Sequence, residues 1–137
     1  MDYVLAIDQG TSSSRALVLD TAGVIHGSAQ REFDQSFPHD GWVEHDPQVL
    51  WETVLETARG ALTTAGIDAR DLTGIGITNQ RETTLIWDAA TGVPVYNAIV
   101  WQDRRTAPRC DAIRADGMVD AIAAATGLVV DPYFSST

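Results

Sequence analysis

Tyr3 to Asp20 reads YVLAIDQGTSSSRALVLD, two apolar runs at residues 3–7 and 15–20 with a polar turn between them. Short apolar runs bounded by turn residues are typical of buried strands. A tight turn at residues 21–23, which ends in glycine, leads to a further strand-like run at 24–33. The sequence therefore predicts three strands in an antiparallel meander.

The next segment carries the start and stop signals of a helix. Asp46 suits the N-cap, Pro47 suits the first helical position, and Gly66 suits the C-terminal stop. Apolar residues between them recur at helical spacing and predict one buried stripe. The stripe consists of Trp51, Val54, Leu55, Ala58, Leu62 and Ala65.

The second half of the chain adds further elements. Residues 73–78 read as a strand, and its two glycines indicate close packing of a helix or a ligand against the backbone. Residues 83–97 predict a hairpin. Two shorter helices should follow, one that begins no earlier than Arg104 and one over residues 118–126. Three strands, a helix and a fourth strand predict an α/β or α+β layer fold.

The charge balance excludes some classes of partner. Nine Lys and Arg against nineteen Asp and Glu give the 137 residues a net charge of −10. Nucleic acids and anionic membranes need a basic surface, so we expect neither partner. The N-terminal residues lack the basic region of a secretory signal, and one cysteine, Cys110, fits a reducing compartment. We therefore expect a cytoplasmic protein in which Cys110 is a packed thiol.

Residues 8–15, DQGTSSSR, carry the first chemical signal. The N–H groups of a tight hairpin can converge on one point, Gly10 permits close approach, and the hydroxyls with Arg15 add donors for phosphate oxygens. Asp8, at the end of a strand, suits Mg²⁺. The loop lacks the lysine and the following helix of a P-loop. An ordinary polar turn explains the same residues, so their chemistry leaves both interpretations open.

Several stretches, in order along the chain, resemble the polyol and sugar kinases of the FGGY family, within the superfamily of actin-like ATPases. They are DQGTSSSR (8–15), GWVEHDP (41–47), GITNQRETT (76–84), YNAIVWQDRRT (96–106), and TGL with DPYFS (126–128 and 131–135). The resemblance implies an α/β, ribonuclease H-like domain with a three-stranded antiparallel meander, a helix and a further strand, incomplete at the C-terminus. Residues 1–137 would be the N-terminal part of the first kinase domain, which binds substrate and phosphate, with the second domain absent.

The same resemblance implies an activity, which is ATP-dependent phosphorylation of glycerol to glycerol 3-phosphate with Mg²⁺. Glycerol and ATP are therefore the expected small-molecule partners. The resemblance assigns the ATP phosphates to Gly10, Thr11, Ser12, Ser13 and Arg15, the metal to Asp8, and glycerol to Arg81, Glu82, Trp101 and Tyr133.

Residue chemistry alone leaves the proposed glycerol site open. Arg81 can donate to adjacent hydroxyls and Glu82 can accept from them, but an exposed ion pair is the simpler interpretation without the resemblance. Trp101 is either an apolar wall against the polyol carbons or a core residue. Gln80 and Asp103 either orient Arg81 or lie solvated at the surface.

The resemblance also predicts what lies outside this chain. The family's catalytic base and adenosine pocket are expected beyond Thr137, so we expect no catalytic residue within the chain and no useful turnover from it alone. An uncovered strand edge and helix face predict marginal stability and self-association, and we expect a homo-oligomer. The alternatives are a kinase for another polyol or sugar, a non-catalytic module that binds glycerol or phosphate, and a plain interaction domain.

Overall fold

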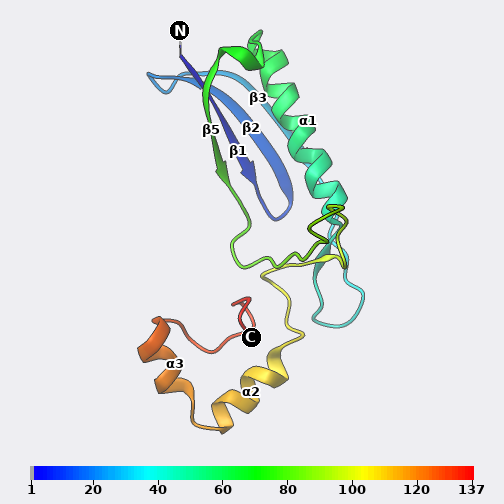
Figure 1. Cartoon of the computed structure of the whole chain (residues 1–137), viewed down its shortest axis with the longest axis vertical. Coiled ribbons are helices and arrows are strands. Elements are labelled where there is room, and N and C mark those ends of the chain that lie inside the picture. The colour runs from blue at the N-terminus through cyan, green and yellow to red at the C-terminus, as the bar shows by residue number, and fades with distance from the viewer. Residues whose placement is uncertain (1) are drawn as a thin grey trace. The chain divides into compact units, whose positions relative to one another are not determined.

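The computed structural model describes residues 2–137, which divide into two compact units (Figure 1). The first unit comprises residues 2–34 and 46–80, and the second comprises residues 35–45 and 81–137. Among the described residues, every helix is too short or too polar to cross a membrane.

The first unit is built on a four-stranded sheet. Its strands are β1 (Tyr3–Gln9), β2 (Ser13–Asp20), β3 (Ile25–Glu32) and β5 (Leu72–Thr78), in the order β3-β2-β1-β5. The first three pair antiparallel, so the predicted meander is confirmed. β5 lies parallel to β1 at the edge of the sheet.

Helix α1 (Pro47–Ala65) covers one face of this sheet and has the predicted ends (Figure 1). The Asp46 carboxylate accepts a hydrogen bond from the Gln48 N–H at 2.8 Å. Gly66 ends the helix in the left-handed conformation, with a φ of 67°. A 3₁₀ turn at Ala69–Asp71, which the sequence did not predict, then leads into β5.

The buried face of α1 differs from the predicted stripe. Trp51 is 58% exposed, whereas Thr53, Thr57 and Ala61 are fully buried against the sheet. Both threonine hydroxyls are satisfied: that of Thr53 bonds to the Ser14 hydroxyl at 2.9 Å, and that of Thr57 donates to the Thr53 carbonyl at 2.8 Å. The partly buried helix residues around them include four of the predicted ones. These four are Val54, Ala58, Leu62 and Ala65.

Small residues let α1 approach β3 closely. A Cβ atom at Gly27 would lie 2.3 Å from the Ala61 carbonyl oxygen and 2.6 Å from the Ala65 backbone nitrogen. A Cβ atom at Gly60 would lie 2.9 Å from the Cβ of Ala29. The close packing of a helix on glycine therefore occurs on β3.

The expectation that a helix packs closely on the glycines of β5 is wrong, and the alternative of a ligand there stays a prediction. No atom would lie within 4 Å of a Cβ placed on Gly74 or Gly76. Ile75 and Ile77 are 60% and 73% exposed, because α1 packs mainly over β2 and β3. β5 is therefore an uncovered edge strand, as expected, and its isoleucine side chains are exposed.

The second unit contains β4 (Glu44–His45), β6 (Ala98–Ile99), α2 (Ala107–Ala115) and α3 (Val119–Thr126). The two strands, which the sequence did not predict, form a short antiparallel pair. Both helices lie where they were predicted, and Gly127 ends α3 with a φ of 73°. The thiol of Cys110, on α2, is fully buried as expected.

The predicted hairpin forms without regular strands. The Asp88 N–H donates to the Val93 carbonyl at 2.9 Å, and the Val95 N–H donates to the Ile86 carbonyl at 3.0 Å. An isolated bridge between Trp87 and Pro94 joins its two arms, and Thr84 makes another with Ile99 of β6. The arms expose several large apolar side chains, a composition that stabilises strands poorly without a covering layer.

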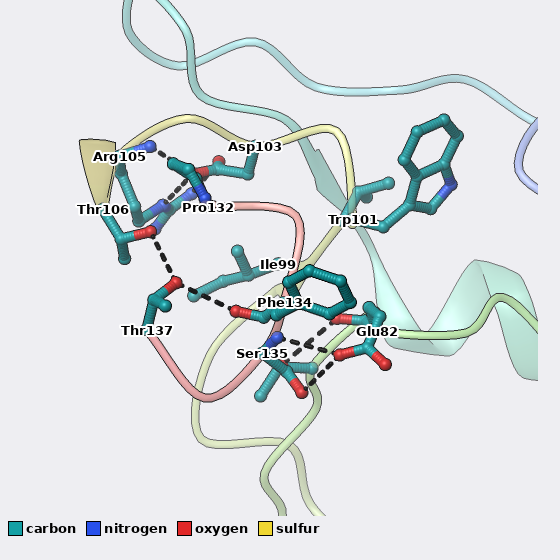
Figure 2. Close-up of a pocket in the computed structure, with 12 residues that line it drawn as sticks. Glu82, Ile99, Trp101, Asp103, Arg105, Thr106, Pro132, Phe134, Ser135 and Thr137 are labelled. Carbon is teal, nitrogen blue, oxygen red and sulfur yellow. Dashed lines mark hydrogen bonds and ion pairs between the residues drawn. The ribbon is translucent and has the colours of Figure 1, made fainter. Parts of the chain in front are cut away.

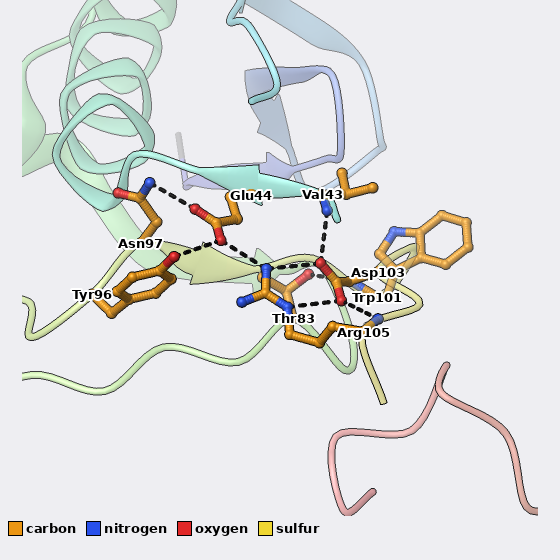
Figure 3. Close-up of polar contacts among 8 residues, drawn as sticks. All are labelled: Val43, Glu44, Thr83, Tyr96, Asn97, Trp101, Asp103 and Arg105. Atoms are coloured by element: carbon orange, nitrogen blue, oxygen red, sulfur yellow. Dashed lines mark hydrogen bonds and ion pairs between the residues drawn. The ribbon is translucent and has the colours of Figure 1, made fainter. Parts of the chain in front are cut away.

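Glu44 is a buried carboxylate in the core of the second unit (Figure 3). Its Oε1 accepts from the Arg105 guanidinium at 2.7 Å and from the Tyr96 hydroxyl at 2.9 Å. Its Oε2 accepts from the Asn97 amide at 2.9 Å. Three side chains from a distant part of the sequence therefore neutralise and solvate a charge that water does not reach.

Asp103 is a second buried carboxylate that shares the same guanidinium (Figure 3). It accepts from Arg105 through both oxygens at 2.9 Å, and from the Val43 N–H at 2.7 Å. The guanidinium carbon of Arg105 also lies 3.8 Å from the centroid of the Trp42 ring. Asp103 therefore organises Arg105 and β4, which corrects the expectation that it orients Arg81.

The hydrogen bonds decide the charge state of both carboxylates. Burial alone would raise the pKa of Glu44, but its bonds from Arg105, Asn97 and Tyr96 bring that pKa below its ordinary value. Burial likewise opposes ionisation of Asp103, and the bonds from Arg105 and from the Val43 N–H lower its pKa. Both groups are therefore ionised at neutral pH.

Gly27→Ala should destabilise the first unit by about 2–3 kcal/mol, because its methyl group would collide with the α1 backbone. Gly74→Ala is the matched control, since the same change on β5 meets open space. Denaturant unfolding measures both. Equal midpoints for the two variants would contradict the close approach of α1 to β3.

Arg105→Met should destabilise the protein by about 3–5 kcal/mol at neutral pH, because it leaves two buried carboxylates without their cation. Arg70→Met, which removes an exposed ion pair with Asp68, should cost less than about 1 kcal/mol. Urea unfolding at several pH values measures the difference.

The pH dependence identifies the cause. The lowered pKa values of Glu44 and Asp103 give the wild type stability that is present at neutral pH and lost as pH falls below about 4. In Arg105→Met, unopposed burial raises the pKa of both carboxyl groups. As pH falls, both groups become protonated, and the variant no longer carries the cost of two buried, unpaired charges. The difference in the free energy of unfolding between the wild type and Arg105→Met should therefore decrease from pH 7 to pH 4. A difference that does not change with pH would contradict this account.

Candidate functional site

The predicted phosphate loop is the turn between β1 and β2. The Gly10 N–H donates to the Ser13 carbonyl at 2.9 Å, and a Cβ atom at Gly10 would lie 3.0 Å from that oxygen. Glycine therefore avoids a crowded contact within the turn itself. Thr11 and Ser12 lie at its tip, and the Ser12 carbonyl accepts from the Phe33 N–H at 3.2 Å. The loop is therefore short and held at both ends.

Arg15 and Ser13 are connected through Gln30, a residue of β3 that the sequence did not indicate. Arg15 donates to the Gln30 Oε1 through Nε at 3.0 Å and Nη2 at 2.7 Å. The Gln30 amide donates to the Ser13 hydroxyl at 3.1 Å. Gln30 is directly opposite Arg15 in the meander, so a correct strand register would have found it.

Asp8 lies where a metal ligand beside the loop was predicted. It is directly opposite Arg15 on β2 and Thr78 on β5, and all three line a hollow of about 310 Å³. Residues 2–137 contain no group of three or more metal-ligating side chains. Mg²⁺ bound to nucleotide phosphates is usually held by one or two carboxylates, so a single Asp8 fits this ion.

Gln80 belongs to the phosphate-loop end of the first unit. It is 7% exposed, which rules out the solvated interpretation, and its amide donates to the Gln9 Oε1 at 3.1 Å. The Gln9 amide in turn donates to the Gly10 carbonyl at 2.8 Å. Gln80 therefore supports the loop from the end of β5.

Glu82, in the second unit, has an unusual backbone. With a φ of 66°, it is the one non-glycine residue among the described residues in the left-handed region. Its Oε2 accepts from the Ser135 N–H at 2.9 Å and from the Ser135 hydroxyl at 3.0 Å (Figure 2). These bonds, together with the charge of Arg81, lower the pKa of Glu82. The carboxylate is therefore an ionised acceptor.

Aromatic rings gather close to this carboxylate. Trp101 and Tyr133 pack edge to face, with ring centroids 5.6 Å apart, and Tyr133 packs in the same way on Phe134 at 5.0 Å. Glu82, Trp101 and Phe134 line a hollow of about 120 Å³ (Figure 2). Tyr133 contacts the ring of Trp101 without lining the hollow.

The structure thus brings three of the four predicted glycerol residues together, and Arg81 is the exposed neighbour of Glu82. Their roles stay predictions. Phe134 and Ser135 were not predicted as site residues, although they follow Tyr133 directly in a stretch that carries the resemblance. An ionised acceptor, an adjacent cation and an aromatic wall can together bind a small neutral polyol.

Comparisons with known proteins identify the family of the chain. The model of the FGGY family of carbohydrate kinases, N-terminal domain, matches residues 3–137. A glycerol kinase of Methylibium petroleiphilum is 61% identical over all 137 residues, which correspond to 28% of its own length.

Solved structures share the fold. A glycerol kinase of Plasmodium falciparum, crystallised with ADP, superposes with a TM-score of 0.88 at 34% identity, over 98% of this chain and 27% of that one. A xylulose kinase of Brucella ovis gives 0.86 at 31% identity, over 96% and 27% of the two chains. Since the model of the family's N-terminal domain also matches nearly the whole sequence, the chain belongs to the FGGY family of carbohydrate kinases.

Proposed function

We propose that this chain is the glycerol- and phosphate-binding part of an enzyme that transfers the γ-phosphoryl group of ATP to glycerol, giving glycerol 3-phosphate. One observation carries the proposal: the ionised Glu82 carboxylate lies beside Arg81 and lines a small hollow together with Trp101. The 61% identical relative is a glycerol kinase, and its identity over the full chain supports the same substrate.

The first unit supplies the phosphate chemistry. Backbone N–H groups and hydroxyls of the β1–β2 turn donate to phosphate oxygens, and the Arg15 guanidinium adds a charged donor. Gln30 holds Arg15 before a nucleotide binds, which reduces the entropy lost on binding. The phosphate-binding residues are Gly10, Thr11, Ser12, Ser13 and Arg15. Mg²⁺, when bound, neutralises charge on the phosphates, and Asp8 is the residue that would hold it.

The second unit supplies the polyol chemistry. Glycerol is uncharged and carries little apolar surface, so hydrogen bonds must provide most of its specificity. Glu82 accepts from its hydroxyls and Arg81 donates to them, while Trp101, against which the Tyr133 ring packs, provides a wall for the carbon atoms. Fixing the polyol in this way orients one terminal hydroxyl for attack, which is the main task of a phosphoryl-transfer enzyme.

The attacking hydroxyl also needs a proton acceptor. This chain spans 28% of its glycerol kinase relative, and we place the general base outside residues 1–137, as the family resemblance implies. Glu82 is unsuited to the task, since its lowered pKa makes it a weak base and two bonds already occupy its Oε2.

Glu82→Ala should lower kcat/KM for glycerol by about 10- to 100-fold, because a charged hydrogen bond to the polyol is lost. A coupled assay of ADP formation, on the protein expressed from its complete gene, measures this. Glu56→Ala, which removes an exposed carboxylate of α1, is the control and should leave kcat/KM unchanged.

The same assay separates the rival functions. Turnover with xylulose or another sugar, but not with glycerol, would favour a different carbohydrate kinase. Glycerol binding by calorimetry with no turnover would favour a non-catalytic binding module. The absence of both glycerol binding and turnover would favour a plain interaction domain.

Arg15→Ala should raise KM for ATP or lower kcat, with kcat/KM for ATP reduced by about 10- to 100-fold through loss of a charged phosphate contact. Arg31→Ala is the matched control, since Arg31 lies on the neighbouring strand β3 and pairs with Glu56 instead. Equal effects of the two variants would mean that Arg15 acts only through the net charge of the sheet.

A further inference from the structure

We propose that Ser135 is a positioning residue, which holds the Glu82 carboxylate in place so that its other oxygen accepts a hydrogen bond from the polyol. The inference rests on the proposed function of Glu82 and concerns a residue that touches the carboxylate rather than the substrate. Glu82 and Ser135 line the same hollow (Figure 2).

The division of acceptor sites supports this role. A carboxylate oxygen offers about two lone-pair positions, and both Ser135 donors reach Oε2, at 2.9 and 3.0 Å. No hydrogen bond from residues 2–137 engages Oε1 of Glu82. Ser135 therefore fixes the carboxylate through one oxygen and leaves the second to accept from a ligand.

The backbone of Glu82 makes such fixing necessary. A residue other than glycine in the left-handed region is strained by about 1–3 kcal/mol and persists only where its surroundings hold it. The two bonds from Ser135 join this turn to a segment 53 residues further along the chain. They both oppose the relaxation of the Glu82 turn and limit the rotation of its side chain.

Ser135 itself is placed by contacts that do not involve Glu82. Asp131 accepts from the Tyr133 N–H at 2.9 Å through its carboxylate and from the Phe134 N–H at 3.1 Å through its carbonyl. The guanidinium of Arg104 bonds to the same carboxylate at 2.9 Å. The segment is therefore a built turn that presents Ser135 to Glu82.

The charges near Glu82 define the expected pH behaviour. Arg81 is adjacent in sequence, and Arg105 and Asp103 line the same hollow, where they bind each other. Ser135 contributes the largest lowering of the Glu82 pKa, through its N–H and then its hydroxyl. Removing the hydroxyl raises that pKa, so the acid limb of glycerol binding should move to higher pH.

The test compares Ser135→Ala, Ser135→Thr and Ser136→Ala in the protein expressed from its complete gene. Ser135→Ala should raise KM and the calorimetric Kd for glycerol by about five- to tenfold, with kcat and KM for ATP changed less than about twofold. Ser135→Thr keeps the hydroxyl and should restore binding. Ser136→Ala, at the exposed neighbouring serine, should resemble the wild type.

The pH profile separates positioning from a general structural defect. The acid limb of glycerol binding should move to higher pH in Ser135→Ala and stay in place in Ser136→Ala. Wild-type affinity in Ser135→Ala, an unmoved acid limb, or no rescue by Ser135→Thr would overturn the inference. Tighter glycerol binding in Ser135→Ala would also overturn it, since Ser135 would then compete with the polyol. A wild-type protein without affinity for glycerol would overturn the proposed function itself.

Discussion

The second unit depends on one guanidinium that two buried carboxylates share. Arg105 bonds to Glu44 on β4 and to Asp103 two residues before it, and without it both charges would lie in the protein interior unpaired. Isolated buried charges cost several kcal/mol each, so packing of these chain segments that leaves the two carboxylates unpaired is strongly disfavoured. The short β4–β6 pair contributes few hydrogen bonds of its own. Electrostatic pairing therefore supplies order that regular secondary structure does not, next to the loop that carries Trp101.

The two candidate sites use polar residues in different ways. At the phosphate loop, a glycine turn closes on itself and Gln30 aligns Arg15 from the neighbouring strand. At the polyol site, a strained turn presents Glu82, and a separate turn presents the serine that bonds to it. In both places the charged side chain that we propose to contact the ligand is oriented by a neutral hydrogen-bonding partner. Neutral partners orient a charged group without cancelling the charge that the ligand needs.

Local signals in the sequence predicted local structure well. The Asp46 cap, the Gly66 stop and the meander turns depend on neighbouring residues, and each was found as predicted. The contact face of α1 was predicted in part: four of the six predicted residues pack on the core, but apolar periodicity favours large residues and missed Thr53, Thr57 and Ala61, which close approach to the sheet selects. Strand glycines are ambiguous for the same reason, since only the packed structure decides which of them a helix approaches.

Long-range polar pairing was beyond any periodicity argument. The partners of Glu44 lie 52 to 61 residues away, and Ser135 lies 53 residues from Glu82. A charged residue is predicted to be exposed, because most charged residues are. The neighbouring residues in the sequence give no signal of a partner far along the chain. The difference between prediction and structure is larger at binding sites, because binding residues occupy turns and strained positions where pattern rules fail. The left-handed backbone of Glu82 is therefore informative in itself, since its strain persists because a second segment holds the carboxylate. A ligand with little apolar surface is bound mainly by hydrogen bonds, so its site needs an acceptor that is held in place in this way.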